Sequence, residues 1–420
     1  MKKQLQHIKT IAISNKILIK NFSYLSVLQV FNILIPLLTY PYLIRVLGKE
    51  TYGLVVFAQA IVGYLLILVS FGFNLSATRE ISLHRLNKDK LNEIVSSVFT
   101  IKIILFILSS LLLTALLLLI PKAHGYELLF IVSMTVCLND VIFPIWYFQG
   151  IEQMKYITYI SLISKFVFLV LIFVVISQPS DYLFVPVIYG VGSLIAGFIS
   201  LTIIFKKHKI KFIFQPFYTL KKYFIDSVPI FLSNVSISLY VSTNKVIIGT
   251  FLGMSEVAYY DLAEKLTSVM KIPQQILGQS LFPKISNEQN KGFVRKIFKI
   301  SILSHLLLFF IVLSFSKYII ILLGGEQMLP AWIVVNILAL TVPLIAMSNV
   351  FGIQLLIPFG YNKLFSNIIL SSGLFYLTQL VIIWLTFGFT LLTISISTLI
   401  TELFVTTLMY YYCKKHKLWI

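Results

Sequence analysis

Charged residues are scarce in this chain. They make up 12% of its 420 residues, against about 25% in a typical soluble protein. Hydrophobic residues supply 58% of the sequence, and the mean hydropathy is +0.94. A soluble core does not need this much apolar sequence. The composition therefore excludes an ordinary soluble domain, and it excludes a disordered chain as well.

Acids, cysteines and catalytic motifs are also few. The chain has 15 Asp and Glu, and its two cysteines, Cys137 and Cys413, lie in or beside apolar runs. We therefore expect no disulfide framework and no zinc site. The sequence contains no HExxH, GxSxG, Walker A or GxGxxG motif, and its six histidines are scattered. An enzyme, an ATPase or a bound cofactor is accordingly not expected.

Long apolar runs fill the sequence instead. Runs of about 18 to 25 residues between charged or turn-rich breaks predict membrane-spanning helices. The expected spans are 22–44, 52–74, 96–120, 128–149, 157–177, 183–205, 227–252, 257–282, 299–323, 331–357, 364–387 and 391–412. The predicted fold class is an all-α integral membrane protein with about twelve transmembrane helices.

The net charge of +19 is distributed unequally over the connecting segments. With these spans, one side receives 25 Lys and Arg, and the other receives Arg45, Lys49, Lys122 and Lys317. Because cytoplasmic loops carry the excess of Lys and Arg, both termini are predicted to be cytoplasmic. Topology and lipid headgroups account for the basic loops, so nucleic-acid binding is not needed.

A polar segment from Lys206 to about Asp226 divides the predicted helices six and six. We therefore predict two lobes, residues 1–210 and 211–420, which are parallel repeats around a central cavity. A faint internal similarity supports this division. Leu47-Gly48 recurs as Leu252-Gly253, each time at the turn from the first helix of a half into the second.

Span 257–282 has a polar face. At about 100° per residue, its polar residues share an arc of roughly 120°. They are Asp261, Glu264, Lys265, Ser268, Lys271, Gln275 and Gln279. This face predicts a wet cavity; the alternative is a set of buried ion pairs that only hold helices together, such as Asp261 with Lys265. Pro273 predicts a kink, because it leaves the carbonyl of Val269 without its helical partner.

Other spans carry weaker polar stripes. The candidate residues for binding a polar substrate are Lys245, Lys265, Lys271, Asn32, Gln59, Asn234 and Lys165. Among the cavity residues, Lys245, Lys265 and Lys271 outnumber Asp261 and Glu264, which favours an anionic ligand. Glu402 stands alone in its helix, and we interpret it at least as readily as a structural group.

Several stretches of the chain resemble a known family. They are Tyr42-Leu43-Ile44-Arg45-Val46-Leu47-Gly48 with Tyr52-Gly53, Phe71-Gly72-Phe73-Asn74-Leu75-Ser76-Ala77-Thr78-Arg79-Glu80, Trp146-Tyr147-Phe148-Gln149-Gly150-Ile151-Glu152-Gln153-Met154, Tyr260-Asp261-Leu262-Ala263-Glu264-Lys265 and Leu281-Phe282-Pro283-Lys284. In this order, on a basic chain with about twelve spans, they resemble the polysaccharide flippases of the O-antigen transporter (Wzx) type. That family belongs to the multidrug/oligosaccharidyl-lipid/polysaccharide exporter superfamily, whose fold is that of the multidrug and toxin extrusion (MATE) transporters.

The resemblance implies a function in the bacterial cytoplasmic membrane. It implies translocation of undecaprenyl-pyrophosphate-linked oligosaccharide units by alternating access, with membrane lipids, the polysaccharide polymerase and the chain-length machinery as partners. Coupling to a proton or sodium ion would fall to Asp261 or Glu264. Asn244 departs from the family, because many relatives have Asp before the residue equivalent to Lys245.

Two other functions remain open from the sequence. A cation-coupled multidrug exporter of the same superfamily predicts a cavity dominated by acids and aromatic rings. A polysaccharide polymerase or ligase needs a substantial outer catalytic loop, and the predicted outer segments are short.

Overall fold

The computed structural model describes residues 2–120 and 123–419, and every regular element in them is helical. The expected all-α class is therefore confirmed. The chain divides into two compact units, one of Met1–Tyr42 with Ile61–Leu232 and the other of Leu43–Ala60 with Ser233–Ile420. The predicted division into lobes at residue 210 differs from these units and stays a prediction.

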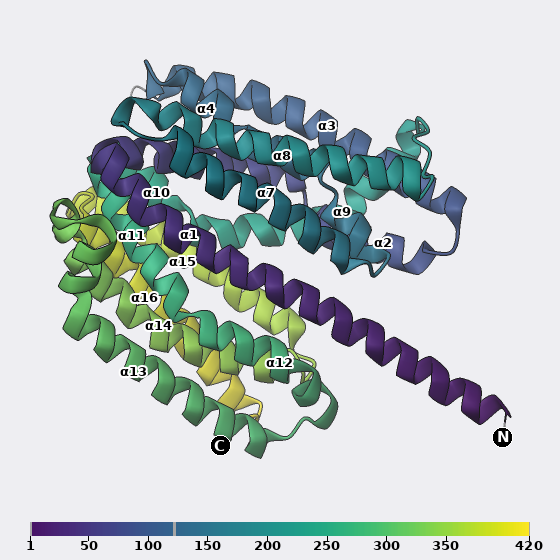
Figure 1. Ribbon diagram of the computed structural model, residues 1–420. Coiled ribbons are helices and arrows are strands. Elements are labelled where there is room, and N and C mark those ends of the chain that lie inside the picture. The colour runs from purple at the N-terminus through teal and green to yellow at the C-terminus, as the bar shows by residue number, and fades with distance from the viewer. Residues whose placement is uncertain (1, 121–122, 420) are drawn as a thin grey trace. The chain divides into compact units, whose positions relative to one another are not determined.

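The first unit contains the two outer parts of α1 (Lys2–Ser70), on either side of residues 43–60, and the helices that follow it (Figure 1). These are α2 (Phe73–His84), α3 (Lys88–Leu119), α4 (Glu127–Ser133), α5 (Thr135–Ile142), α6 (Ile145–Gly150), α7 (Met154–Val175), η2 (Pro179–Leu183), α8 (Phe184–Thr202), η3 (Ile203–Lys207) and the start of α9 (Phe217–Val241). Phe71 stacks on Phe224 and Phe231 with ring centroids 4.3 and 4.5 Å apart. These rings place the start of α9 in the first unit rather than the second.

The second unit contains residues 43–60 of α1, the end of α9 and all later elements (Figure 1). The later elements are α10 (Thr243–Ile247), η4 (Ile248–Leu252), α11 (Met254–Met270), α12 (Ile272–Glu288), α13 (Lys291–Gly324), η5 (Glu326–Ala331), α14 (Trp332–Phe351), η6 (Gly352–Leu356), α15 (Asn362–Thr386) and α16 (Leu391–Lys415). Its apolar core includes Val350, Phe351 and Leu355, packed against Met409 of α16.

The predicted membrane spans all fall on helical segments. Within the described residues, nine helices are long and apolar enough to cross a membrane, and one of them, Ser23–His84, holds two predicted spans. Spans 227–252 and 257–282 contain most of the polar candidates. Each includes side chains that the structure does not describe, and neither is among these nine helices. The chain is thus a multi-pass helical protein, and the exact number of twelve spans stays a prediction.

Two glycines of the internal similarity interrupt helices. Gly48 has φ 77° and ψ 162° inside α1, a conformation that favours glycine. Gly253 is extended at the boundary between η4 and α11. The two turns meet within the second unit, where a Cβ added to Gly53 would lie 1.7 Å from the carbonyl oxygen of Met254. Glycine at position 53 therefore permits backbone contact between α1 and α11.

Segments that the charge pattern assigned to one side of the membrane meet within each unit. In the first unit, Arg85 forms a 2.8 Å ion pair with Glu152. In the second unit, the Lys291 ammonium donates to the carbonyl of Lys417 at 2.8 Å. Arg45, from the opposite side, donates to the carbonyl of Leu322 at 2.6 Å.

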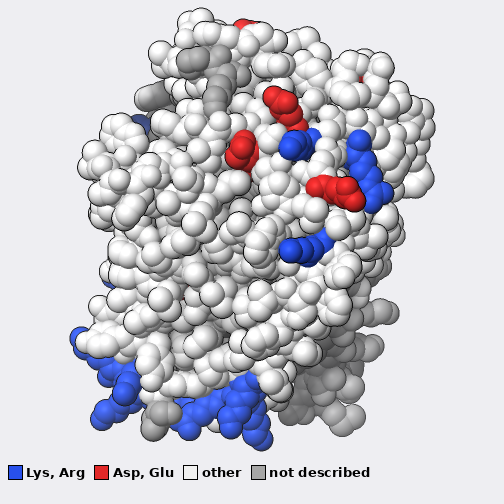
Figure 2. Space-filling model, turned by 90° about the vertical axis from the view of Figure 1, so that its left-hand side faces the viewer, with Lys and Arg blue, Asp and Glu red and all other residues white. Residues whose placement is uncertain are grey.

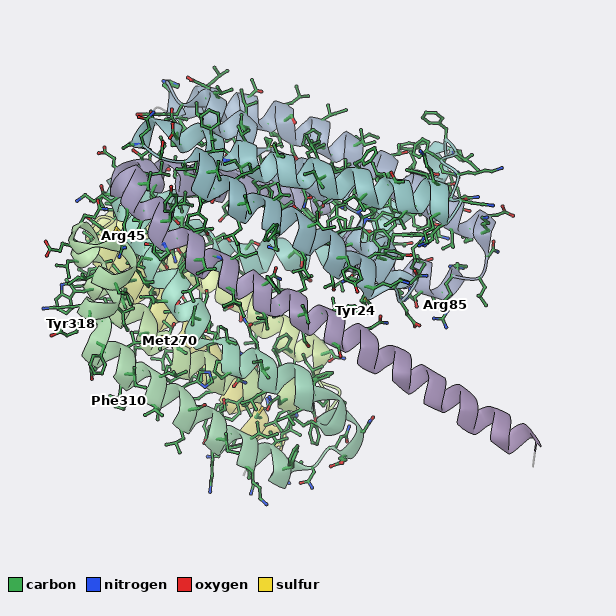
Figure 3. All side chains as sticks on the ribbon, in the orientation of Figure 1. Tyr24, Arg45, Arg85, Met270, Phe310 and Tyr318 are labelled. Carbon is green, nitrogen blue, oxygen red and sulfur yellow. The ribbon has the colours of Figure 1, made fainter. Side chains whose placement is uncertain are left out.

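Arg45 and Tyr318 lie at one end of the second unit (Figure 3). Figure 2 shows Lys and Arg side chains gathered along one edge of the face drawn, without Asp or Glu beside them. Lys122 lies outside the described residues. Which end is cytoplasmic stays a prediction.

We expect Gly53→Ala to destabilise the protein, because its new methyl group would overlap the Met254 backbone. Overpacking typically lowers the free energy of unfolding by about 1–3 kcal/mol. We expect a loss of about 3 kcal/mol or more here, because the overlapping atoms belong to the backbone and cannot move aside as a side chain can. Thermal unfolding of the purified protein in detergent measures the effect. Gly63→Ala is the matched control, because a Cβ added at Gly63 meets nothing within 4 Å. This variant should leave the free energy of unfolding unchanged or raise it by about 0.5–1 kcal/mol. Equal stability of the two variants would contradict the close approach at Gly53.

Candidate functional site

A cluster of four charged side chains lies in the second unit, between α10 and α11. The Lys245 ammonium is 2.8 Å from Asp261 Oδ1 and 2.7 Å from Glu264 Oε2. Lys265 forms an ion pair with the other oxygen of Asp261. We call Lys245, Asp261, Glu264 and Lys265 the charged cluster.

Asp261 is at the centre of the charged cluster and is only 3% exposed. Besides its two lysines, it accepts a 2.8 Å hydrogen bond from the Tyr52 hydroxyl, and that hydroxyl accepts one from Lys265 at 2.7 Å. These donors compensate for removing the carboxylate from water. The buried ion pair of Asp261 and Lys265, which the sequence left as an alternative, is therefore present.

The charged cluster is nevertheless accessible on one side. The side chains of Lys245, Glu264 and Lys265 keep 22%, 27% and 36% of their surface exposed. Glu264 also lines a small cavity of about 70 Å³, which we call the inner cavity. The site is thus neither fully packed nor open to lipid on all sides.

Most residues that line the inner cavity have polar side chains. Its lining residues include Asn244, Tyr260, Glu264, Thr267, Lys271, Thr341, Thr398, Thr401 and Glu402. A larger cavity of about 360 Å³, which we call the apolar cavity, lies among α9, α14, α15 and α16 and includes Ile345, Phe365, Ile369, Val405 and Glu402 in its wall. Ile345 and Glu402 line both cavities.

Asn244 is buried in an uncharged hydrogen-bond network. Its amide nitrogen donates to Tyr260 Oη and, at 3.0 Å, to Thr398 Oγ1, and its amide oxygen accepts from the Tyr376 hydroxyl. The network joins α10, α11, α15 and α16 without a charge. Asn244, the residue that departs from the family pattern, therefore has a structural role in holding these helices together.

The structure brings together some of the predicted site residues. Lys245, Lys265, Asp261 and Glu264 form the charged cluster, and Lys271 lines the inner cavity next to Glu264. Their roles in binding or ion coupling stay predictions.

The other candidates lie elsewhere. Gln59 is exposed and Asn234 partly exposed in the second unit, whereas Asn32 is exposed and Lys165 half-buried in the first. Between Asn234 and Lys245 the helix is interrupted once, because α9 ends at Val241 and α10 begins at Thr243.

The predicted kink in span 257–282 is confirmed. The helix α11 ends at Met270, and α12 begins at Ile272 with Pro273 in its first turn. The single polar face expected along this span is consequently divided at Lys271. Gln275 is exposed on α12, and the side chain of Gln279 lies outside the described part.

The structure corrects the expected charge balance. The sequence counted three lysines against two acids, but Glu402 of α16 lines the same inner cavity as Glu264 and Lys271. Counting Glu402 gives equal numbers of cations and acids. Moreover, ion pairs neutralise Lys245 and Lys265. The sequence missed this balance because Glu402 is distant in sequence and has no charged neighbour in its own helix.

Tyrosines of the site were not among the predicted residues either. Tyr52, Tyr260 and Tyr376 donate or accept the hydrogen bonds that fix Asp261 and Asn244. Tyr52 and Tyr260 belong to stretches of family resemblance, which was the only available signal. Tyr376 comes from a helix without any such signal.

A second polar group lies at the basic end of the first unit. His208 is 3.0 Å from the Tyr147 hydroxyl, and Lys155 and Lys207 lie over the Tyr156 ring at 5.0 and 5.2 Å. Burial lowers the pKa of the His208 imidazole below its usual value, and Lys207 and Lys155 lower it further. This group fits the headgroup region of a membrane, where stacked lysines and tyrosines are common.

Comparison with known proteins identifies the family. The family model described as "Polysaccharide biosynthesis protein" matches residues 18–289. The chain belongs to this family. It is 32% identical over 408 residues to a "Putative O-antigen transporter" of Escherichia coli (strain K12), covering 95% of this chain and 97% of that protein. A "Putative O-antigen transporter" of Shigella dysenteriae is 27% identical over 367 residues, covering 85% and 91%.

Solved structures show that the fold is that of membrane transporters. A lipid II flippase, MurJ in an inward closed conformation, matches with a TM-score of 0.77 at 14% identity, over 93% of this chain and 87% of that one. An inward-facing MATE family multidrug transporter of the MOP superfamily matches at 0.72 and 13% identity, over 91% and 94%. The predicted family and the MATE-like fold class are therefore confirmed.

We expect Asp261→Asn to destabilise the protein, because Lys245 and Lys265 would lose the carboxylate between them. Breaking a buried pair costs about 3–5 kcal/mol, and the partial exposure of both lysines reduces this to about 2–4 kcal/mol. Unfolding in detergent, followed by intrinsic fluorescence, measures the loss. Arg79→Gln removes an ion pair whose arginine is 75% exposed, and it should change stability by less than about 0.5 kcal/mol. If the two variants lose equal stability, the buried pairs contribute no more than a surface pair.

Proposed function

We propose that this chain is a flippase that moves undecaprenyl-pyrophosphate-linked oligosaccharide units across the bacterial cytoplasmic membrane by alternating access. The observation that carries the proposal is the half-accessible charged cluster beside a polar cavity, in a chain that shares its family with proteins named O-antigen transporters. Buried charge is costly in a membrane protein and usually marks a substrate or ion pathway.

The three parts of such a substrate need different surroundings. Sugar hydroxyls need hydrogen-bonding groups, which the threonines of the inner cavity provide. A pyrophosphate needs cations, and Lys271 is the lysine in the described lining of the inner cavity, outside the ion pairs of the charged cluster. The polyprenyl tail can stay in lipid, so the inner cavity would bind only the headgroup of the substrate.

The membrane potential supports movement in this direction. Moving about two negative charges outward gains on the order of 4–5 kcal/mol at about 100 mV, if the empty carrier returns uncharged. We place both termini in the cytoplasm, because the basic segments that meet in the structure are the ones the charge rule assigns to that side. The lipid bilayer, the polysaccharide polymerase and the chain-length machinery are the proposed partners, and a proton or sodium ion the proposed coupling ion.

The multidrug exporter is the alternative within the same fold. It predicts a cavity rich in acids and aromatic rings, whereas the apolar cavity has Phe365 and Glu402 as its one ring and one acid in the described lining. A polymerase or ligase fits less well than a flippase, because the relatives are named transporters. Drug-resistance assays in an exporter-deficient host separate the first alternative from the proposal.

We expect Lys271→Ala to reduce surface polysaccharide at least about tenfold, because each 1.4 kcal/mol of lost substrate affinity is a factor of ten. The assay complements a strain that lacks its own O-antigen transporter, with protein level measured by immunoblot. Lipid-linked repeats should then accumulate on the cytoplasmic leaflet. Accumulation on the outer leaflet would indicate a polymerase instead.

Lys299→Ala is the matched control for this experiment. Lys299 is an exposed lysine on α13, away from the inner cavity. Surface polysaccharide should stay normal in this variant. Normal polymer in Lys271→Ala as well would remove Lys271 from the site.

A further inference from the structure

Glu402 lies in an unusual position. It is near the middle of α16, a helix apolar enough to cross a membrane, and it lines both the inner and the apolar cavity. Its backbone carbonyl accepts a 2.7 Å hydrogen bond from Thr406. No ion pair within 4.0 Å among the described residues includes its carboxylate, in contrast to Asp261 and Glu264. A carboxylate that lies in apolar surroundings without a cation at ion-pair distance can become neutral by taking up a proton.

The surroundings of Glu402 contain few charges. The described residues that share its two cavities and bear polar side chains are Asn244, Tyr260, Glu264, Thr267, Lys271, Thr341, Thr398 and Thr401 in the inner cavity, and Ser233, Ser348, Asn349 and Ser366 in the apolar cavity. Only Glu264 and Lys271 are charged. Since Glu264 pairs with Lys245 at 2.7 Å, Lys271 is the cation that a charged Glu402 faces across the inner cavity.

The charged groups around the inner cavity therefore balance in a particular way. The charged cluster contains two lysines and two acids and is neutral. Lys271 and an ionised Glu402 are a second neutral set. When Glu402 takes up a proton, its negative charge disappears and the positive charge of Lys271 is left without compensation.

We propose that Glu402 is a proton-binding site whose protonation makes the inner cavity cationic and so admits the anionic pyrophosphate headgroup of the substrate to Lys271. This inference rests on the proposed function for the identity of the anion. Release of the proton restores the negative charge beside Lys271 and favours departure of the anion. Proton binding and anion binding are thereby linked at one cavity, and linkage is reciprocal: each ligand raises the affinity for the other.

The proposal assigns different roles to the acids of the site. Asp261 accepts from two lysines and Tyr52, so that its negative charge is fully compensated and has no reason to change during transport. Glu264 is held by Lys245. The sequence suggested Asp261 or Glu264 as the residue that couples transport to a proton. The proposal assigns this role to Glu402 instead.

Infrared spectroscopy tests the proton site directly. Difference spectra of the purified full-length protein between acidic and alkaline pH report the C=O stretch of protonated carboxyl groups. The wild type should show a band that titrates with pH, and Glu402→Gln should lose it. Glu264→Gln should keep it. Gln has the shape of the protonated acid, so the Glu402 variant should fold, which size-exclusion chromatography checks. A band that persists in Glu402→Gln would overturn the proton site.

Ligand stabilisation tests the link to the anion. Undecaprenyl pyrophosphate should raise the unfolding temperature of the wild type at low pH, and its affinity should fall about tenfold or more as Glu402 ionises. Glu402→Gln should keep the high affinity at alkaline pH, apart from the titration of the lipid itself. Lys271→Ala should bind undecaprenyl pyrophosphate weakly at every pH.

The outcomes separate the two proposals. Identical pH profiles for wild type and Glu402→Gln would overturn the role of Glu402 while leaving the proposed substrate intact. A titrating Glu402 with no effect of the lipid at any pH would contradict the proposed substrate and the admission of the anion, and leave the proton site in place.

Discussion

The second unit depends on the compensation of one buried carboxylate. Asp261 is almost inaccessible to solvent. Its two carboxylate oxygens form ion pairs with Lys245 and Lys265 and accept a hydrogen bond from the Tyr52 hydroxyl. An uncompensated carboxylate in this environment would cost several kcal/mol. Residues from α1, α10 and α11 are thereby tied to one point, and α1 and α11 also approach each other closely at Gly53.

This compensation also decides which cations remain for a ligand. Lysines that neutralise Asp261 cannot give their full charge to a substrate, because binding an anion there would expose the carboxylate again. Lys271 lies between the end of α11 at Met270 and the start of α12 at Ile272, outside these ion pairs. The break that Pro273 introduces thus separates a structural set of charges from a cation that is free to act on a ligand in the inner cavity.

Patterns local in the sequence predicted much of this arrangement. Apolar runs predicted the helices, Pro273 predicted the break, and the helical spacing of Asp261 and Lys265 offered their ion pair as an alternative to an open cavity face. The features that the sequence did not predict depend on contacts between segments that are distant in the chain. Glu402 looked isolated because its partners are on other helices, and the approach of Tyr52 to Asp261 depends on a turn at Gly48 whose direction no local pattern specifies.

The distinction between Asp261 and Glu402 follows from the same physical rule applied twice. Both carboxylates lie in apolar surroundings, and each must be either compensated or neutralised. Asp261 is compensated by fixed cations, which makes it a structural anchor. Glu402 lines two cavities and has no cation within ion-pair distance in the described structure. Its remaining route to neutrality is a proton, and a proton, unlike a fixed lysine, can be exchanged in each transport cycle.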